Sequence, residues 1–465
     1  MLGFSCTRTT AALAVVSVAC CAGCVVDDGI EPVDHITWLA MRASDVRELG
    51  YLEPVPLAFV SAAAFAAAEE ERARNIDEAE LQEFAETWGR LGYFPVDADL
   101  RPRIADMHDW VGGFYSADDG SITVIGTASD GVLLHEHVHA LQDQHFDLAG
   151  YQDTPTSDAE IARRAITEGD AELGEARFFA QSAGAELEHL VWDLQVARDA
   201  SERVLEEAEL PLLEADRAFV YNYGLEYTLA NLTGWSIDAP EYTRPTPFDW
   251  RRENGLFAER APRSAWEVLH KDASPPQGSD LVGIGEVPAE LAGELETVEW
   301  DTLGSWYTYV LLRPVDGEDG VGELRPLVES WRGDRVLFVQ DGDAYGVVWA
   351  SAWEDEDRAT QLAAAFQALH GVVLDQLAPG LAGVAEDGEA AWIERRGEKV
   401  VVMKNVDVAH AAALAEAAVT GAPPPAAEDE ASSPDSNSAP ARRKLGAWVD
   451  RLSGSRLHRA PPAAR

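Results

Sequence analysis

One helical segment constrains this chain more than any other, because it places two imidazoles and a carboxylate on neighbouring turns. The segment is LLHEHVHALQDQHFDL, Leu133 to Leu148, and it contains His135, Glu136 and His139. Residues four apart lie on the same face of an α-helix, so His135 and His139 can offer ring nitrogens to one ion. Glu136 projects beside that ion, where a carboxylate can take a proton from bound water. The spacing predicts a metal-binding helix that carries its own base.

The same pattern also admits a purely structural interpretation. The chain has 11 histidines in 465 residues, so a chance H-E-x-x-H has odds of roughly a few in a hundred. The structural alternative is an acidic, histidine-rich helix exposed to solvent. The apolar residues Leu134, Val138 and Leu141 favour instead a helix packed into a core. A third protein ligand distinguishes the two interpretations, because a metal site needs one.

His145 is one candidate for the third ligand. It stands at the third histidine of the longer pattern H-E-x-x-H-x-x-G-x-x-H. The glycine of that pattern permits a tight turn, but Gln142 occupies its place and would adopt positive φ only with strain. The methionine turn that accompanies the pattern has no counterpart, since Met107 precedes the helix and Met403 is remote. These departures favour a structural or ligand-orienting role for His145.

Glu168 is the other candidate, in the segment AITEGDA (165–171) at the start of a second predicted helix. Two histidines followed by a helix-borne glutamate resemble the gluzincin arrangement of thermolysin and the membrane alanyl aminopeptidases. The resemblance implies a Zn²⁺ ion held by His135, His139 and Glu168, with a fourth position left for water. Glu172, one helical turn later, is placed either to accept a hydrogen bond from a ligating histidine or to lie exposed.

A narrower resemblance covers about residues 45 to 375. The chain is similar to a poorly characterised family of secreted or lipid-anchored gluzincin-like proteins, whose motif helix is approximately HELxHALQDQHFDL. His137, Ala265 and Lys271 depart from the residues usual in that family. Only the metal-site part of the likeness implies a chemistry. Besides the motif helix and EGDA, the similar segments are EPVPLAFV (53–60), VGGFYSADDGSITVIG (111–126), FVYNYGLEYT (219–228), PRSAWEVLH (262–270) and ESWRGDRVLFVQDGDAYGVVWASAW (329–353).

The resemblance implies hydrolysis of peptide bonds. Zinc lowers the pKa of its bound water to about 7 and polarises the substrate carbonyl. Glu136 would take the proton of that water and pass it to the leaving amine. The tetrahedral oxyanion needs a second donor, for which Tyr221 is the first candidate and His270 the second, ahead of Tyr223 and Tyr227. For each of these four, the alternative is a packed core residue. His137 faces away from the metal by helix geometry.

The charge balance excludes one class of partner. The chain has 82 acidic and 36 basic residues, which gives a formal net charge of −46. So acidic a surface repels nucleic acid and keeps the protein well solvated. The composition, with 46% hydrophobic and 25% charged residues, is ordinary for a folded soluble protein.

The N-terminus predicts export and anchoring. An apolar run over 11–19 is shorter than the ~20 residues that span a bilayer, which is typical of a signal peptide. The sequence from Cys21 to Cys24 resembles a bacterial lipobox, with cysteine in place of the usual leucine. By that resemblance Cys24 is the lipidated first residue of the mature protein, and its acyl chains hold the protein at a membrane surface. The alternative is secretion after cleavage nearby.

We expect an α+β fold with a zincin-like, mainly helical zinc-site domain and a smaller α+β C-terminal lobe. Helical spacing predicts two helices over 57–91, and strand-like runs on either side of a turn at 117–120 predict a hairpin that offers an edge strand to substrate. The predicted organisation is a signal peptide (1–24), a tether (25–44), a metallopeptidase domain (45–275), an α+β lobe (276–420), a disordered linker (421–441) and a basic tail (442–465).

Two functions follow from these observations. The first is a lipid-anchored extracytoplasmic zinc metalloprotease that acts on peptide or protein substrates. The alternative is a degenerate zinc-binding surface lipoprotein that serves as a binding module. An intact Glu136 favours the enzyme, because a protein that only binds has no chemical need for a base there.

Overall fold

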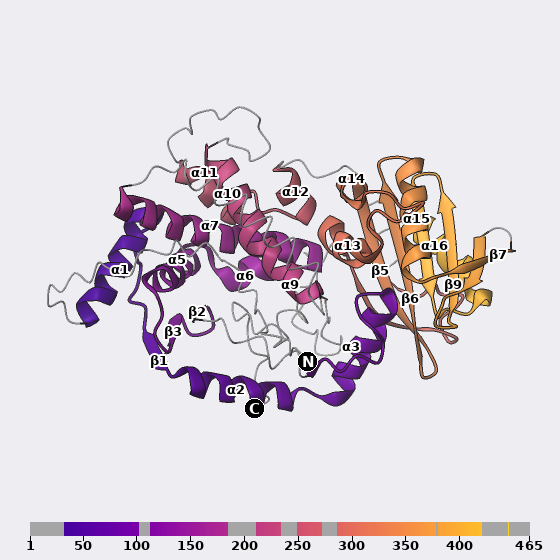
Figure 1. Cartoon of the computed structure of the whole chain (residues 1–465), viewed down its shortest axis with the longest axis horizontal. Helices are drawn as coiled ribbons and strands as arrows, with labels where there is room; N and C mark the ends of the chain where they lie inside the picture. Colours follow the sequence, from indigo (N-terminus) through magenta and orange to yellow (C-terminus); the bar gives the residue numbers. More distant parts are fainter. Residues whose placement is uncertain are drawn as a thin grey trace, which may run out of the picture.

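The computed structural model combines a helical N-terminal region with a C-terminal region built on an antiparallel sheet (Figure 1), which is the expected mixture of helices and strands. The predicted signal peptide, linker and basic tail lie outside the described residues, apart from Leu445 in the tail. Within the described part of the chain, no helix is both long and apolar enough to cross a membrane. The structure describes residues 32–101, 112–184, 211–233, 249–271, 286–377, 380–420 and 445.

The N-terminal region contains most of the helices. Its elements are α1 (Pro32–Arg47), β1 (Leu57–Val60), α2 (Ala62–Asn75), α3 (Glu78–Leu91), β2 (Gly113–Ser116), β3 (Ser121–Ile125), α5 (Asp130–Phe146), α6 (Leu148–Gln152), α7 (Ser157–Ala183), α9 (Pro211–Ala218), the π-helix η1 (Phe219–Tyr223), α10 (Gly224–Thr233), α11 (Trp250–Ala258) and α12 (Ala265–His270). Helix α5 is the predicted metal-binding helix, and it packs against α1 and α7.

The helix α1 overlaps the segment predicted to be a tether, 25–44. Its residues Leu39, Ala43 and Val46 are fully buried in the main core. They recur at three- to four-residue intervals, which is the spacing of one helix face. The part of the predicted tether from residue 32 onward is therefore folded, and it covers the metal-binding helix.

The small sheet has the order β1-β3-β2, with β1 parallel and β2 antiparallel to β3. The hairpin predicted around 117–120 is therefore present as β2 and β3. Residues 57–60, predicted to begin a helix, form β1 instead, and α2 and α3 follow it. The edge strands of this sheet are therefore β1 and β2. The strand that directly precedes the metal-binding helix is β3, which is hydrogen-bonded to a neighbouring strand on each side and is not an edge strand.

The C-terminal region is a seven-stranded sheet of order β4-β5-β6-β10-β9-β8-β7, in which every neighbouring pair is antiparallel. Its elements are β4 (Glu296–Asp301), α13 (Gly304–Leu312), the 3₁₀ helix η2 (Arg313–Val315), α14 (Leu324–Glu329), β5 (Trp331–Asp341), β6 (Ala344–Trp353), α15 (Glu356–Leu369), β7 (Val373–Leu377), β8 (Gly380–Val384), β9 (Ala390–Arg396), β10 (Lys399–Lys404) and α16 (Val408–Thr420).

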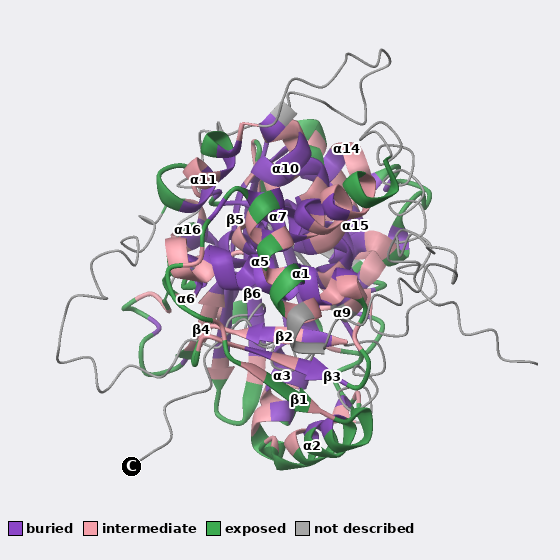
Figure 2. Cartoon of the chain, turned by 90° about the vertical axis from the view of Figure 1, so that its left-hand side faces the viewer, coloured by how far each residue is buried: buried purple, intermediate pink, exposed green. Residues whose placement is uncertain are grey.

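Helices lie on both faces of this sheet, and its central strands β5, β6 and β10 are buried on both sides along most of their length. Side chains alternate across a strand: Phe338 joins the main core, where it contacts Trp88 of α3 with 4.7 Å between ring centroids. Its neighbour Leu337 joins a second core that includes Leu414 of α16. Helix α3 thus ties the two regions together, while α2 runs largely exposed along the outside of the molecule (Figure 2).

A carboxylate of the C-terminal sheet holds the start of α7. Asp301, at the end of β4, accepts hydrogen bonds from the backbone N–H of Ser157 at 2.9 Å and from its hydroxyl at 2.5 Å. The first N–H groups of a helix have no partner within the helix, so an acceptor from outside stabilises the end. The side chain of Thr156 caps the same end by accepting from Ala159 N–H.

Two glycines allow α7 to approach α10 closely. A Cβ atom added to Gly169 would lie 2.1 Å from the carbonyl carbon of Gly224, and one added to Gly224 would lie 2.1 Å from the carbonyl oxygen of Ala165. No side chain fits at either position without moving a backbone. This contact explains why glycine follows Glu168 directly.

Substitution of Gly169 by alanine is expected to lower the free energy of unfolding by about 1–3 kcal/mol or more, because the added methyl forces the two helices apart. The matched control is Gly255→Ala in α11, where the nearest atom to an added Cβ is the flexible end of Arg260 at 3.0 Å. That change is expected to be neutral or stabilising by up to ~1 kcal/mol. Denaturant unfolding of both variants measures the difference, and equal midpoints would contradict the close-contact explanation.

Candidate metal centre

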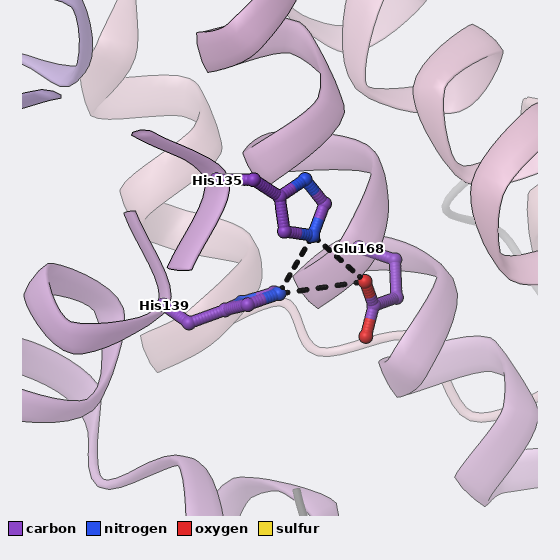
Figure 3. A group of neighbouring side chains, drawn as sticks. All are labelled: His135, His139 and Glu168. Carbon is purple, nitrogen blue, oxygen red and sulfur yellow. Dashed lines mark hydrogen bonds and ion pairs between the residues drawn. The ribbon is translucent and has the colours of Figure 1, made fainter. Parts of the chain in front are cut away.

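The helices α5 and α7 bring three predicted ligands together in the interior (Figure 3). His135 Nε2 lies 2.9 Å from His139 Nε2 and 3.2 Å from Glu168 Oε2. His139 Nε2 lies 3.4 Å from the same carboxylate oxygen. All three residues are buried, and their ligand atoms form a group that could hold a metal ion. Glu168 lies well inside α7 rather than at the start of a helix, because that helix already begins at Ser157.

The separations of these atoms suit a tetrahedral ion. Nitrogen and oxygen ligands lie about 2.0–2.1 Å from zinc, which places two ligands of a tetrahedron roughly 3.3 Å apart. The three observed separations, from 2.9 to 3.4 Å, bracket that value. Two nitrogens and one carboxylate oxygen are also a donor set that zinc accepts. The group could therefore hold a metal ion through three protein ligands.

The charges around the site favour a cation. Burial acts to lower the pKa of His135, but its hydrogen bond with Glu168 and the charges of Glu136 and Glu172 outweigh burial and raise that pKa to about 10. Burial acts to raise the pKa of Glu168, but the two histidines outweigh it and hold that pKa well below its usual range. The first shift means that the surrounding carboxylates favour positive charge on His135, and the second means that the histidines favour the ionised form of Glu168.

Glu136 is held beside the group rather than within it. Its Oε2 accepts a hydrogen bond of 2.8 Å from the backbone N–H of Tyr115 in β2. The hydroxyl of Tyr115 donates to Asp143 Oδ2 at 2.7 Å, so the strand is attached to α5 at two points. Burial raises the pKa of Glu136 above its ordinary value, and the nearby histidines oppose that shift. A carboxylate so placed can exchange a proton.

Two further carboxylates lie behind His135. Its Nδ1 is 3.6 Å from Glu172 Oε1 and 3.9 Å from Glu175 Oε2, beyond ordinary hydrogen-bond length. Burial and the charge of Glu175 raise the pKa of Glu172 to about 8. Glu172 is therefore half-buried beside a candidate ligand without a hydrogen bond to it, which matches neither of its two sequence interpretations. Glu175 is a neighbour of the site that the sequence did not single out.

The candidates for an oxyanion donor lie at different distances from the metal-site residues. Tyr221 lies in the π-helix η1, with 6.2 Å between its ring centroid and that of His135. Tyr223, in the same π-helix, packs in the core between Phe219 and Trp306. Burial and the neighbouring carboxylates raise the pKa of Tyr221 well above its usual value, so its hydroxyl stays protonated and able to donate.

The other two candidates also have partners elsewhere. His270, at the end of α12, stacks on Trp266 with 3.8 Å between ring centroids and hydrogen-bonds its backbone oxygen through Nδ1. Tyr227 is buried in the main core. Of the four candidates, Tyr221 is the one with a ring contact to a metal-site histidine.

His145 is directed away from the group. Helix α5 continues past Gln142 to Phe146 and ends at Asp147, whose φ of 53° makes the turn. The helix therefore carries His145 to a different side, where its Nε2 contacts the backbone oxygen of Gly50 at 2.7 Å. The turn that the longer histidine pattern requires is absent at Gln142, as the sequence indicates.

The structure adds Gln142 to the site. Gln142 is fully buried and contacts His139 Nδ1 through its Oε1 at 2.8 Å. In the sequence it stands out only as a departure from glycine. Its place three residues after His139, on the same helix face, is the pattern that would have predicted the contact.

Comparison with known proteins gives one partial match. A family model described as a domain of unknown function (DUF8575) matches residues 293–415. That segment runs from the residues before β4 into α16 and lies within the predicted C-terminal lobe, so it contains none of the three candidate ligands. No curated protein and no solved structure matches the chain.

Separate changes of Glu168 and His145 test the third ligand. Glu168→Ala is expected to abolish tight zinc binding, because it removes one of three donors and leaves two buried histidines without their carboxylate. His145→Ala is expected to keep one zinc per chain, since that ring contacts Gly50 instead. Zinc content after dialysis, measured by elemental analysis, reports both results. Zinc that survives loss of Glu168 but not of His145 would reverse the assignment.

Proposed function

We propose that this protein is a zinc-dependent peptide hydrolase of the gluzincin type, with a zincin-like helical domain. The observation that carries the proposal is the position of Glu136, a buried carboxylate beside a His-His-Glu group whose atoms are spaced for a tetrahedral ion. His135, His139 and Glu168 would hold zinc through three protein ligands, a number that is typical of catalytic rather than structural zinc.

Zinc, when bound, activates a water molecule and polarises the substrate carbonyl. The protein's own residues move the proton. Glu136 accepts a proton from the attacking water and returns it to the leaving amine, and the Tyr115 N–H holds Oε2 of this carboxylate in place. Tyr221 donates a hydrogen bond to the oxyanion that develops on the former carbonyl oxygen.

The location of Tyr221 supports this role. A π-helix turn is rare and occurs frequently at functional sites, because the extra residue in the turn redirects side chains. Here the π-helix η1 packs on α7 and presents Tyr221 near His135, while Tyr223 stays in the core. The glycine contact that follows, at Gly224, keeps this turn close to Glu168.

The small sheet supports an extended peptide as substrate. β2 is an edge strand, and the N–H of its Tyr115 points at Glu136. An edge strand can pair with an added strand, which would lay a peptide across the base. We infer a peptide or protein substrate. The N-terminal sequence supports the accompanying proposal that Cys24 is lipidated and that the enzyme acts outside the cytoplasm at a bacterial membrane.

Substitution of Glu136 by glutamine is expected to keep one zinc per chain and to lower the rate of peptide cleavage by about 10²–10⁴-fold, because an amide has no basic oxygen to take the proton. The amide oxygen can still accept from Tyr115, so the fold is preserved. The matched control is Asp130→Asn, at the start of the same helix, whose carboxylate pairs with His35 at a partly exposed site. This control is expected to cleave at the wild-type rate.

The measurement combines zinc content with cleavage of a disordered protein and of a broad peptide library. Full activity in Glu136→Gln would refute its role as the base. Wild-type protein that holds zinc and cleaves nothing in the library would favour the alternative, a zinc-binding surface lipoprotein.

A further inference from the structure

We propose that Gln142 is a positioning residue for the metal centre, and that the buried ion pair between Arg47 and Asp170 fixes its orientation. The inference rests on the proposed metal site and names the residues that orient one of its ligands. These residues come from α1, α5 and α7, and all three side chains are fully buried. Through them, the helix that follows the predicted anchor is connected to a candidate metal ligand.

The first contact sets which nitrogen of His139 can bind a metal. A neutral imidazole carries its proton on one ring nitrogen, and only the other offers a lone pair. Because Nε2 faces His135 and Glu168, the proton must sit on Nδ1, where it needs an acceptor. Gln142 Oε1, at 2.8 Å, is that acceptor. Acceptors of this kind fix the tautomer and the ring orientation of metal-binding histidines.

The second contacts decide which end of the Gln142 amide faces His139. Its Nε2 donates to the backbone oxygen of Thr167 at 3.0 Å and to Asp170 Oδ2 at 2.7 Å. A carbonyl and an ionised carboxylate only accept hydrogen bonds, so a flipped amide would direct its oxygen at two acceptors. The amide nitrogen is therefore held on the α7 side, and the oxygen is left for His139.

The third contact stabilises the buried carboxylate of Asp170. Arg47 Nε donates to the same Asp170 Oδ2 at 2.8 Å, and both side chains have no exposed surface. Arg47 is itself held, because its Nη2 donates to Asn254 Oδ1 at 2.8 Å and its guanidinium lies 4.4 Å from the ring centroid of Trp250. Loss of one partner from such a pair leaves an uncompensated buried charge.

A role in packing alone makes a different prediction from a role in positioning. Methionine has nearly the shape of glutamine and keeps the apolar contacts, but it neither accepts from His139 nor donates to Asp170. If Gln142 only filled space, Gln142→Met would leave metal binding unchanged. If it positions His139, the same change weakens metal binding in a protein that is still folded.

The test measures the zinc dissociation constant of the full chain by competition with a chelator, with circular dichroism as a check of folding. Gln142→Met is expected to raise this constant by about 10–100-fold. The matched control is Gln144→Met on the same helix, which removes an amide that ties α5 to the backbone of residues 52 and 53 without touching a candidate ligand. It is expected to bind zinc as wild type does.

A second variant is measured in case Gln142→Met does not fold. Gln142→Asn keeps an amide but is one methylene shorter, so it cannot reach both His139 and Asp170, and a comparable loss of affinity is expected. Wild-type zinc affinity in the folded variant would overturn the inference. Zinc binding that weakens as expected, in a wild type that cleaves no peptide, would uphold the inference while the hydrolase proposal fails. A wild type that binds no zinc would overturn both.

Discussion

The packing of α7 is the constraint on which the rest of the structure depends. This helix contributes Glu168 to the metal centre, and it must lie close enough to α5 for a carboxylate to reach two histidines. Gly169 lets it touch the backbone of Gly224 on another side, which brings Tyr221 near the same point. Asp301 holds its first turn from the C-terminal sheet. One helix thus receives support from three directions, and the site forms where they meet.

Buried charge is the second theme of this fold. A chain with a net charge of −46 gathers Glu136, Glu168, Glu172 and Glu175 around the histidines of one interior group. Glu136 and Glu168 are buried, and Glu172 and Glu175 are half-buried. Buried carboxylates are stable only with cations or protons beside them. A metal dication is one source of positive charge that this group could hold. Asp170, which lies near the group, has the guanidinium of Arg47 as its own cation.

The sequence was sufficient for those features that depend on local spacing. His135 and His139 share a helix face by helix geometry, and the turn at 117–120 lies between two strands as predicted. The sequence was insufficient where contacts between distant segments decide the local structure. Residues 57–60 form a strand because β3 offers them a partner, and α1 is folded because its apolar face covers α5. A local pattern contains no information about such partners.

The same distinction applies to the site. Glu168 was accessible to sequence reasoning because the order of its motif resembles a known arrangement, and the structure places it beside both histidines. Gln142 was seen only as a mismatch to another pattern. Its contacts with Thr167 and Asp170 join α5 to α7, and the docking of two helices cannot be deduced from either one alone.

The bond between Asp301 and Ser157 has a consequence for how the protein folds. Its two partners are 144 positions apart, and the later one belongs to the segment that the family model matches. Closing a loop of that length costs chain entropy, so this bond can persist only while the C-terminal sheet is folded in place. The first N–H groups of α7 therefore depend on the C-terminal region for an acceptor, and loss of that sheet would remove it from the helix that carries Glu168.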